Sequence, residues 1–445
     1  MKSYKLIYKN ILCLLAVCLV LPACEIDDVP DPNNSTIEDI VNNPSVGKLN
    51  NLVVGAQSGM RNNLGTYYDA VSIVGREIYR FSASDPRFTT DLLGFGSTQL
   101  NNNTFYITNP WAARYRVVKN LNILIDVLGS NNLVNSGLIT ESQRQGYLGF
   151  AKTIKAHQLL LNLTMTYENG IRIDVSDPEN PGPIVGRDEA LAAIAGLLDE
   201  GREHLNQAGE EFLFPLSGGF TGFNTPETFL LFNRALAARV SIYRELWTEA
   251  LANLEASFLD LDGDLDRGVY YVFGTGAGDQ LNPLYYPQNA TGELRVVHPS
   301  FIADATPGDD RLAKVSQRTR PATQRDLTGE YDVFIYRSNT APVPIIRNEE
   351  LILMYAEAKI QTSQLPDAVS ALNTIRVSHN LQPYSGPVTQ AALIDEMLRQ
   401  RRYSLLFEGH RWIDLRRYNR LDQLPVDRPD DNVWVSFPVP FAEGT

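Results

Sequence analysis

Cysteine is nearly absent from this chain of 445 residues, and its few positions are informative. Cys13, Cys18 and Cys24 are the only cysteines, and all lie within the first 24 residues. Residues 25–445 therefore offer no disulfide, no thiolate metal ligand and no cysteine nucleophile. A disulfide-held scaffold and a cysteine-dependent enzyme are both excluded.

Histidine and the short motifs of catalysis are equally sparse. The five histidines are scattered and never form the His-Glu-x-x-His pattern of a zinc site. There is no Gly-x-Ser-x-Gly elbow, and no Lys-Ser/Thr pair follows the glycines of 274–278 as a phosphate loop requires. We therefore predict that the protein is not an enzyme. An exported glycosidase stays an alternative, because its carboxylate pair could be any of many acids.

A short acidic run is the nearest approach to a metal site. It carries carboxylates at alternate positions, as a calcium loop would: Asp260, Asp262, Asp264 and Asp266. Leu265 stands where that loop needs glycine, and Tyr271 where it needs glutamate. The pattern favours a solvated acidic turn, so we expect no cofactor, with calcium as the alternative.

Basic residues are also in deficit, with 39 Lys and Arg against 52 Asp and Glu and a net charge of −13. Such a surface is poorly suited to nucleic acid or anionic lipid headgroups. Long hydrophobic runs are missing except for Ile11–Leu21, which is too short to span a bilayer. Contact with a membrane is therefore expected only through an attached lipid.

The N-terminus has the pattern of an export signal. Three lysines precede the apolar run, which ends in Leu21-Pro-Ala-Cys24 and resembles a bacterial lipobox. We predict a signal peptide over 1–23, acylation of Cys24 by fatty chains such as palmitate, and a flexible Pro/Asn-rich tether over 24–46. A plain secretory signal is the alternative.

Helical periodicity dominates residues 47–445, which we expect to form a single binding domain. Helices are predicted around 117–128, 159–163 and 191–198, from a Thr225 cap through a run at 229–259, and over 349–360, 367–377 and 391–407. Alanines recur where paired helices would cross, as in a tetratricopeptide unit: Ala235, Ala237, Ala238, Ala250, Ala356, Ala358, Ala368 and Ala371. The predicted fold is mostly α, a tetratricopeptide-like helix-pair scaffold with long irregular loops at 81–110, 168–187, 209–224, 260–300 and 303–345. Only minor strands are expected, at 333–336 and 433–439.

Two segments near the C-terminus carry a sharper pattern. Arg347–Ala358 leads to Ala371–Arg376, and Arg401–Arg416 contains Glu408-Gly-His-Arg-Trp-Ile-Asp414. Together they resemble the signature of the SusD/RagB family, nutrient-binding outer-membrane lipoproteins of the Bacteroidetes, although Gln400, Ser404 and 378–380 depart from it. From spacing alone, we expect Arg401, Leu405, Glu408 and Trp412 to share a helix face and stabilise the fold. Gly409 should allow a turn or a close backbone approach.

Aromatic residues are the candidates for ligand binding. One group falls in a predicted loop region: Tyr270, Tyr271, Phe273, Tyr285 and Tyr286. A second group comprises Tyr67, Tyr68, Phe105 and Tyr106, beside Trp111, which helical spacing assigns to the core. Rings on loops suit stacking on sugars, and the family resemblance implies glycan binding by such a platform. The alternative is that these rings pin loops to the scaffold.

The resemblance implies a surface-exposed, outer-membrane lipoprotein that captures a nutrient, expected to be a glycan. The implied partner is a SusC-like TonB-dependent barrel, to which the ligand would be delivered. A RagB-like peptide binder stays an alternative, as does the glycosidase.

Overall fold

The computed structural model describes residues 37–129, 132–177 and 179–444. It divides into two compact units at Asn43, and the described part of the first contains the helix α2 (Ile37–Asn42). Of the described part of the predicted tether over 24–46, residues 37–42 are therefore helical, and residues 43–45 are not. The predicted signal peptide and Cys24 lie outside the described residues.

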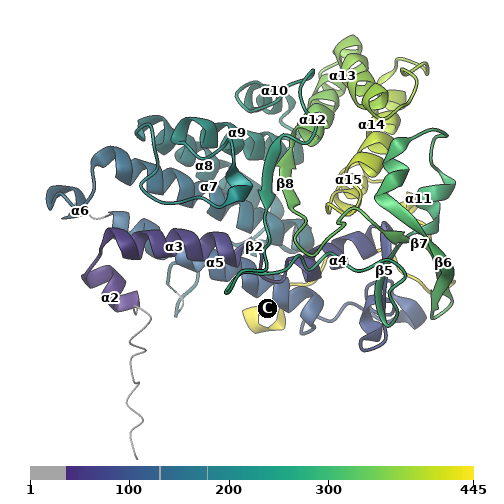
Figure 1. Ribbon diagram of the computed structural model, residues 1–445, viewed down its shortest axis with the longest axis horizontal. Helices are drawn as coiled ribbons and strands as arrows, with labels where there is room; N and C mark the ends of the chain where they lie inside the picture. The colour runs from purple at the N-terminus through teal and green to yellow at the C-terminus, as the bar shows by residue number, and fades with distance from the viewer. Residues whose placement is uncertain (1–36, 130–131, 178, 445) are drawn as a thin grey trace, which may run out of the picture. The chain divides into compact units, whose positions relative to one another are not determined.

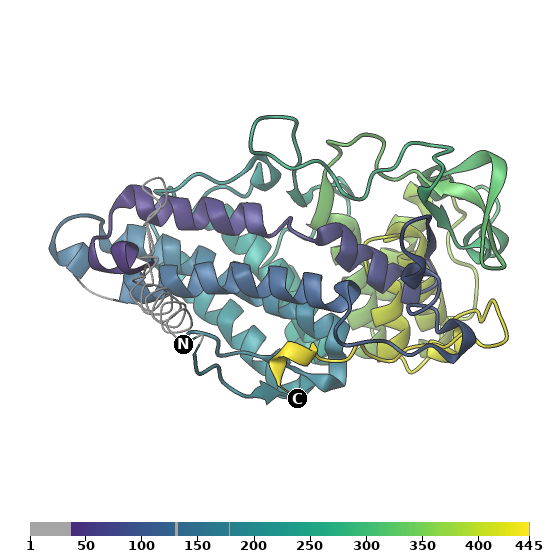
Figure 2. The same cartoon turned by 90° about the horizontal axis from the view of Figure 1, so that it is seen from below.

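Residues 44–444 are mostly helical, as predicted, and the long helices α3, α5, α7, α8 and α9 run side by side (Figures 1 and 2). None of the helices in the described ranges is both long and apolar enough to cross a membrane. The helices are α3 (Val46–Gly59), α4 (Leu64–Val74), α5 (Phe105–Gly129), α6 (Asn132–Asn135), α7 (Glu141–Thr166), α8 (Arg187–Gln207), α9 (Pro226–Tyr243), α10 (Trp247–Glu255), α11 (Pro299–Ala303), α12 (Asn348–Gln361), α13 (Leu365–Ser378), α14 (Gln390–Ser404) and α15 (Arg411–Arg417).

Helix α9 begins as the sequence indicates. The Thr225 side chain accepts a hydrogen bond from the Thr228 amide, and Pro226 occupies the first helical position. The predicted helical run at 229–259 is, however, broken into α9 and α10, with Glu245 in a left-handed conformation (φ 58°) between them. The break folds α10 back onto α9, which buries Ala250 and Leu254. Glu245 is a good helix former, so no local pattern indicates this turn.

Small residues at helix crossings behave as predicted for tetratricopeptide-like pairs. Helices α12, α13 and α14 share one apolar core whose fully buried members include Ala356, Ala368, Ala371 and Met397. Alanine lets helix axes approach closely without a cavity. Each of the eight predicted alanines is buried.

The C-terminal motif does not form one continuous helix. Helix α14 ends at Ser404, and Phe407 and Gly409 both have positive φ angles (59° and 80°) before α15 starts. The predicted helix end at residue 407 and the single helical face from Arg401 to Trp412 are therefore wrong. A Cβ on Gly409 would lie 3.2 Å from Val71 Cγ2, so the predicted turn and close approach are confirmed.

The sheets are small and antiparallel. One has the strand order β1 (Ile78–Ser82), β5 (Glu293–Val297), β7 (Leu327–Val333) and β6 (Val315–Gln324), and two pairs join β2 (Ile171–Arg172) to β3 (Ile184–Val185) and β4 (Gly268–Tyr271) to β8 (Val343–Arg347). The predicted loops at 260–300 and 303–345 thus contain strands, and the strands predicted at 333–336 and 433–439 are wrong. Arg325 and Asp326 both have positive φ in the two-residue β6–β7 turn, without the Asn-Gly that announces such hairpins.

Buried ion pairs link the two signature segments to the rest of the domain. Arg239 of α9 donates two hydrogen bonds to Glu350 of α12, of 2.8 and 2.6 Å, and Arg401 Nε lies 2.6 Å from Asp414 Oδ2. Arg347 pairs with Glu349 and with Glu408. The charged residues of the signature therefore stabilise the fold, as predicted.

We expect Arg239→Met to lower the free energy of unfolding by about 3–5 kcal/mol, because it leaves the Glu350 carboxylate buried without its main partner. Urea denaturation would measure the loss. The control, Glu200→Gln, removes one partner of an exposed pair with Lys152 and should change stability by less than about 1 kcal/mol.

The same pair should give a characteristic acid dependence. Burial alone would raise the pKa of Glu350, but Arg239 lowers it to about 2. A depressed acid pKa stabilises the fold above the unfolded-state pKa of about 4.3, and this contribution disappears as the pH falls towards 2. This account would be contradicted if Arg239→Met and Glu200→Gln lost the same free energy of unfolding and neither changed how stability depends on pH.

Candidate ligand-binding face

The corner between α3 and α4 organises a concave surface lined by polar and aromatic side chains. Arg114 of α5, itself buried, donates a 2.8 Å hydrogen bond to the Met60 carbonyl and another to that of Asn62. Asn63 then takes a left-handed conformation and α4 begins. The backbone of the corner is held from inside, so its polar side chains are left on the outer surface.

The segment after β4 is fastened to this corner. Arg61 Nη1 donates to Asp279 Oδ1 at 2.5 Å and to the Val272 carbonyl at 2.8 Å. Gln280 Nε2 lies 3.0 Å from Asn62 Oδ1. The loop therefore has a defined position against α3, although it contains three glycines in residues 274–278.

Two hollows adjoin at Arg61, which lines both. The larger, of about 510 Å³, lies between the end of α3, the 215–220 loop and β4, and is lined by Val54, Gln57, Ser58, Met60, Arg61, Pro215, Leu216, Ser217, Gly218, Phe220, Tyr270, Tyr271, Val272, Ala277, Gly278, Asp279 and Ile345. The smaller, of about 380 Å³, is lined by residues 61–66, Arg80, Gln280, Leu281, Pro283, Tyr286 and Arg295. We refer to the two together as the Arg61 face. Both volumes suit small molecules.

A buried charge cluster forms the floor of the smaller hollow. The fully buried Asp69 carboxylate accepts hydrogen bonds from Arg295 Nε (2.6 Å) and Nη2 (2.9 Å) and from Arg80 Nη1 (2.5 Å). Burial would raise the pKa of Asp69, but the two guanidinium groups hold it below its ordinary value. Arg295 Nη1 has no hydrogen-bond partner. The floor is therefore rigid, charged and polar.

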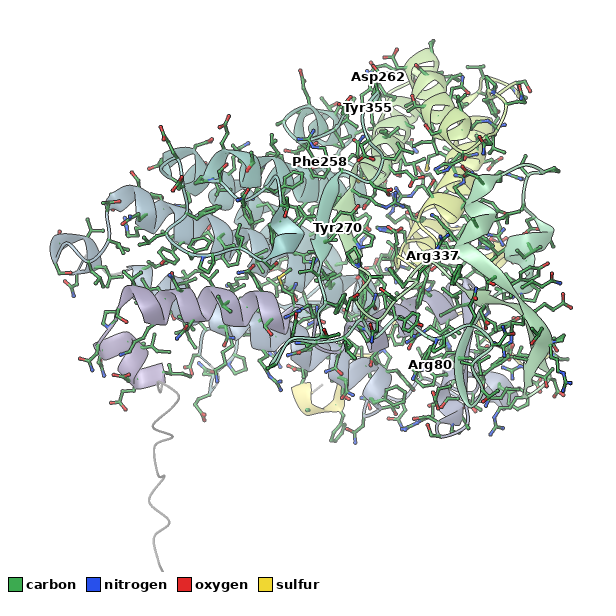
Figure 3. All side chains as sticks on the ribbon, in the orientation of Figure 1. Arg80, Phe258, Asp262, Tyr270, Arg337 and Tyr355 are labelled. Carbon is green, nitrogen blue, oxygen red and sulfur yellow. The ribbon has the colours of Figure 1, made fainter. Side chains whose placement is uncertain are left out.

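Tyrosine rings complete both hollows. The Arg295 guanidinium lies 4.5 Å from the centre of the Tyr286 ring, and Arg80 Nη2 donates to the Tyr286 hydroxyl at 3.3 Å. Tyr270 of β4 lines the larger hollow, and its hydroxyl donates to the Asp266 carbonyl (Figure 3). Half-buried, fixed rings can stack on the apolar face of a ligand, while the neighbouring amide and guanidinium groups bind its hydroxyl groups.

Comparison with known proteins identifies one similar family. The SusD family model matches residues 335–434. Over these residues the chain is similar to the SusD family. The matched segment spans β8, α12–α15 and the buried ion pairs described above, and no curated protein sequence matches the chain.

Solved structures extend the likeness of fold to most of the chain. A SusD superfamily protein from Bacteroides vulgatus has 16% identity, covers 90% of this chain and 96% of its own, and superposes with a TM-score of 0.67. Surface glycan-binding protein A from Bacteroides thetaiotaomicron in complex with laminarihexaose has 15% identity, coverage of 89% and 97%, and a TM-score of 0.69. NanU from B. fragilis has 16% identity, coverage of 92% and 96%, and a TM-score of 0.65.

The SusD-like fold of this chain buries most of the aromatic residues that the sequence singled out. Tyr67 and Tyr68 lie on α4 and Tyr106 on α5, not on loops, and Tyr271 and Phe273 are also buried. The Tyr271 hydroxyl lies 2.9 Å from His157 Nε2, and the Tyr67 hydroxyl 3.0 Å from Thr164 Oγ1. In the structure these rings fasten the scaffold, which was the alternative interpretation. Trp111 is in the core, as predicted.

The other four candidates remain partly accessible. Tyr270 and Tyr286 line the hollows, and Tyr285 is half-buried next to them. The centre of the Phe105 ring lies 5.2 Å from the centre of the Phe88 ring, in a separate cluster of rings. The predicted binding role of all nine rings stays a prediction.

Sequence reasoning missed the polar part of the Arg61 face. Gln57, Arg61 and Asn62 come from the end of α3 and the corner after it, Arg80 from β1 and Gln280 from the loop after β4, and together they form no motif. Only the fold brings them together. As for the acidic run, Asp260 and Asp264 accept hydrogen bonds from amides two residues ahead. Within the described ranges no three potential ligands of the His, Cys, Asp or Glu type are grouped closely enough to hold a metal ion.

We expect Arg61→Ala to release the 272–280 segment from the corner, because two of its hydrogen bonds come from that guanidinium. Hydrogen exchange followed by mass spectrometry should show amides of 273–281 exchanging about fivefold faster, the effect of roughly 1 kcal/mol. Arg87→Ala, which breaks an exposed pair with Asp85 elsewhere, should leave those amides unchanged. Equal exchange in both variants would show that Arg61 does not hold the loop.

Proposed function

We propose that the protein is a cell-surface lipoprotein that binds an oligosaccharide at the Arg61 face and delivers it to an outer-membrane transporter. The observation that carries the proposal is the pair of adjoining hollows, in which fixed tyrosine rings lie beside guanidinium and amide groups. Sugars present apolar C–H faces and many hydroxyls, and this combination matches both.

The arrangement favours binding over chemistry. Arg80, which lines the smaller hollow, pairs with Asp69 and Glu293, and Asp69 also pairs with Arg295. A glycosidase needs a general acid with a raised pKa, whereas the pKa values of Asp69 and Glu293 are both lowered. The relative from B. thetaiotaomicron, described in complex with laminarihexaose, supports a glycan as the ligand class.

We expect Tyr286→Ala to weaken oligosaccharide binding about tenfold, because the ring contributes stacking area and holds the Arg80 and Arg295 side chains in place. Affinity electrophoresis against a panel of polysaccharides would measure retardation. Phe441→Ala is the matched control, since this ring is 66% exposed and lines neither hollow.

Each other outcome of the panel is informative. Retardation that Tyr286→Ala and Phe441→Ala affect equally would place binding elsewhere. Release of shorter sugars by the purified protein would favour the glycosidase. Binding of peptides and of no polysaccharide would favour a RagB-like role.

The lipid anchor is a separate part of the proposal and is supported by the lipobox-like sequence ending at Cys24. Replacing Cys24 by alanine removes the thiol that would carry the lipid, so we expect the protein to move from the membrane fraction to the soluble fraction. Immunoblotting of fractionated cells would measure this. Unchanged membrane association of the alanine variant would refute the anchor.

The proposed partner is a SusC-like TonB-dependent barrel, which rests on the similarity to the SusD family. Co-purification of such a barrel with the tagged protein from outer membranes would test it. The outer-membrane, surface-exposed location follows the same argument, and protease accessibility on intact cells would check it.

A further inference from the structure

A second, larger groove lies away from the Arg61 face and shares no lining residue with it. It has a volume of about 640 Å³ and lies between α11, α14 and α15. Its lining is mostly charged: Ser300, Asp304, Asp395, Leu398, Arg399, Arg402, Tyr403, Arg411, Asp414, Leu415, Arg420, Gln423 and Pro425. Four arginines against three aspartates is unusual on a protein whose acids outnumber its bases overall.

Three of the four arginines already have partners. Arg402 donates to Asp304 Oδ2 at 2.8 Å and to Ser300 Oγ at 2.7 Å, and Arg420 pairs with Asp395. Arg399 reaches the Asp304 carbonyl at 3.5 Å. The third aspartate, Asp414, is buried and engaged by two arginines outside the groove, Arg401 and Arg417. Little negative charge is left for the fourth arginine.

That arginine is Arg411, at the start of α15. Its Nε is buried without a hydrogen-bond partner, and no described residue forms a hydrogen bond or ion pair with the rest of its guanidinium group. Glu77 and Asp304 attract the charge of Arg411, but neither makes an ion pair with it, and burial raises the pKa of Glu77 to about 7. Burial and the neighbouring charge of Arg402 lower the pKa of Arg411 itself to about 9. The groove thus contains a guanidinium group that forms no ion pair with any described residue.

We propose that this groove is a second binding site, for a small ligand carrying a carboxylate or phosphate group, and that Arg411 binds this group. A planar guanidinium binds such anions through two parallel hydrogen bonds, and a partly desolvated setting strengthens them. Arg402 lies at the same groove and adds positive charge. This site is separate from the Arg61 face. The proposal therefore does not depend on whether an oligosaccharide binds at the Arg61 face.

Calorimetric titration of the purified protein in low-salt buffer tests the proposal with three probes: inorganic phosphate, glucuronate and glucose. We expect saturable binding of at least one anion and none of neutral glucose to this site. Binding of both anions points to a general anion site, and binding of glucuronate alone to an acidic sugar. Absence of binding by either anion would overturn the proposal.

Substitution assigns the site. Arg411→Gln should weaken anion binding at least about tenfold, the usual loss for a charge-assisted pair. Arg337→Gln removes the same charge from an exposed residue outside the groove and should leave binding unchanged (Figure 3). Equal binding by wild type and Arg411→Gln would overturn the assignment.

A second variant covers the case in which Arg411→Gln does not fold. Arg402→Gln changes a side chain paired with the exposed Asp304, so circular dichroism should show an intact fold. Its anion binding should fall severalfold, and binding equal to that of wild type would count against the groove.

Discussion

Buried guanidinium–carboxylate pairs hold this molecule together across long sequence distances. Arg239 and Glu350 are 111 residues apart, and Arg295 and Asp69 are 226 apart. Burying two charged side chains costs desolvation free energy, which the pair recovers only when its geometry is good. Loss of either partner would leave the other charge buried and unpaired. These pairs hold helices and strands from distant parts of the chain against one another, and the Arg61 face depends on them through Asp69.

The Arg61 face shares the Arg80–Asp69–Arg295 cluster with this scaffold. Its residues come from the α3–α4 corner, β1, β4, β5 and the loops beside them, and Arg114 fixes the corner from behind. Loops that single side chains hold at a few points tolerate changes in sequence, while the helical scaffold beneath them keeps its structure. One helical scaffold can in this way carry loops with different surfaces.

The sequence predicted the helical body because alanine spacing, the Thr225 cap and the paired signature segments are local patterns. It did not predict the α9–α10 turn at Glu245 or the β6–β7 turn at Arg325 and Asp326, because Glu245 and Arg325 have no turn preference and yet take left-handed conformations. Nor did it separate buried rings from accessible ones: Tyr270 and Tyr271 are neighbours on one strand and point to opposite sides of it. The polar residues of the Arg61 face gave no signal because tertiary contacts alone unite them.

The close contact of Gly409 with α4 links distant parts of the chain. The glycine lies against Val71 and Tyr68, next to Asp69 at the floor of the smaller hollow. The Cβ of a larger residue at 409 would lie 3.2 Å from Val71 Cγ2, so the Val71 side chain would have to shift by a few tenths of an ångström, and the φ of 80° would be strained as well. Substitution at 409 therefore presses on α4 two residues from the carboxylate that pairs with Arg80 and Arg295, although residue 409 does not line the smaller hollow.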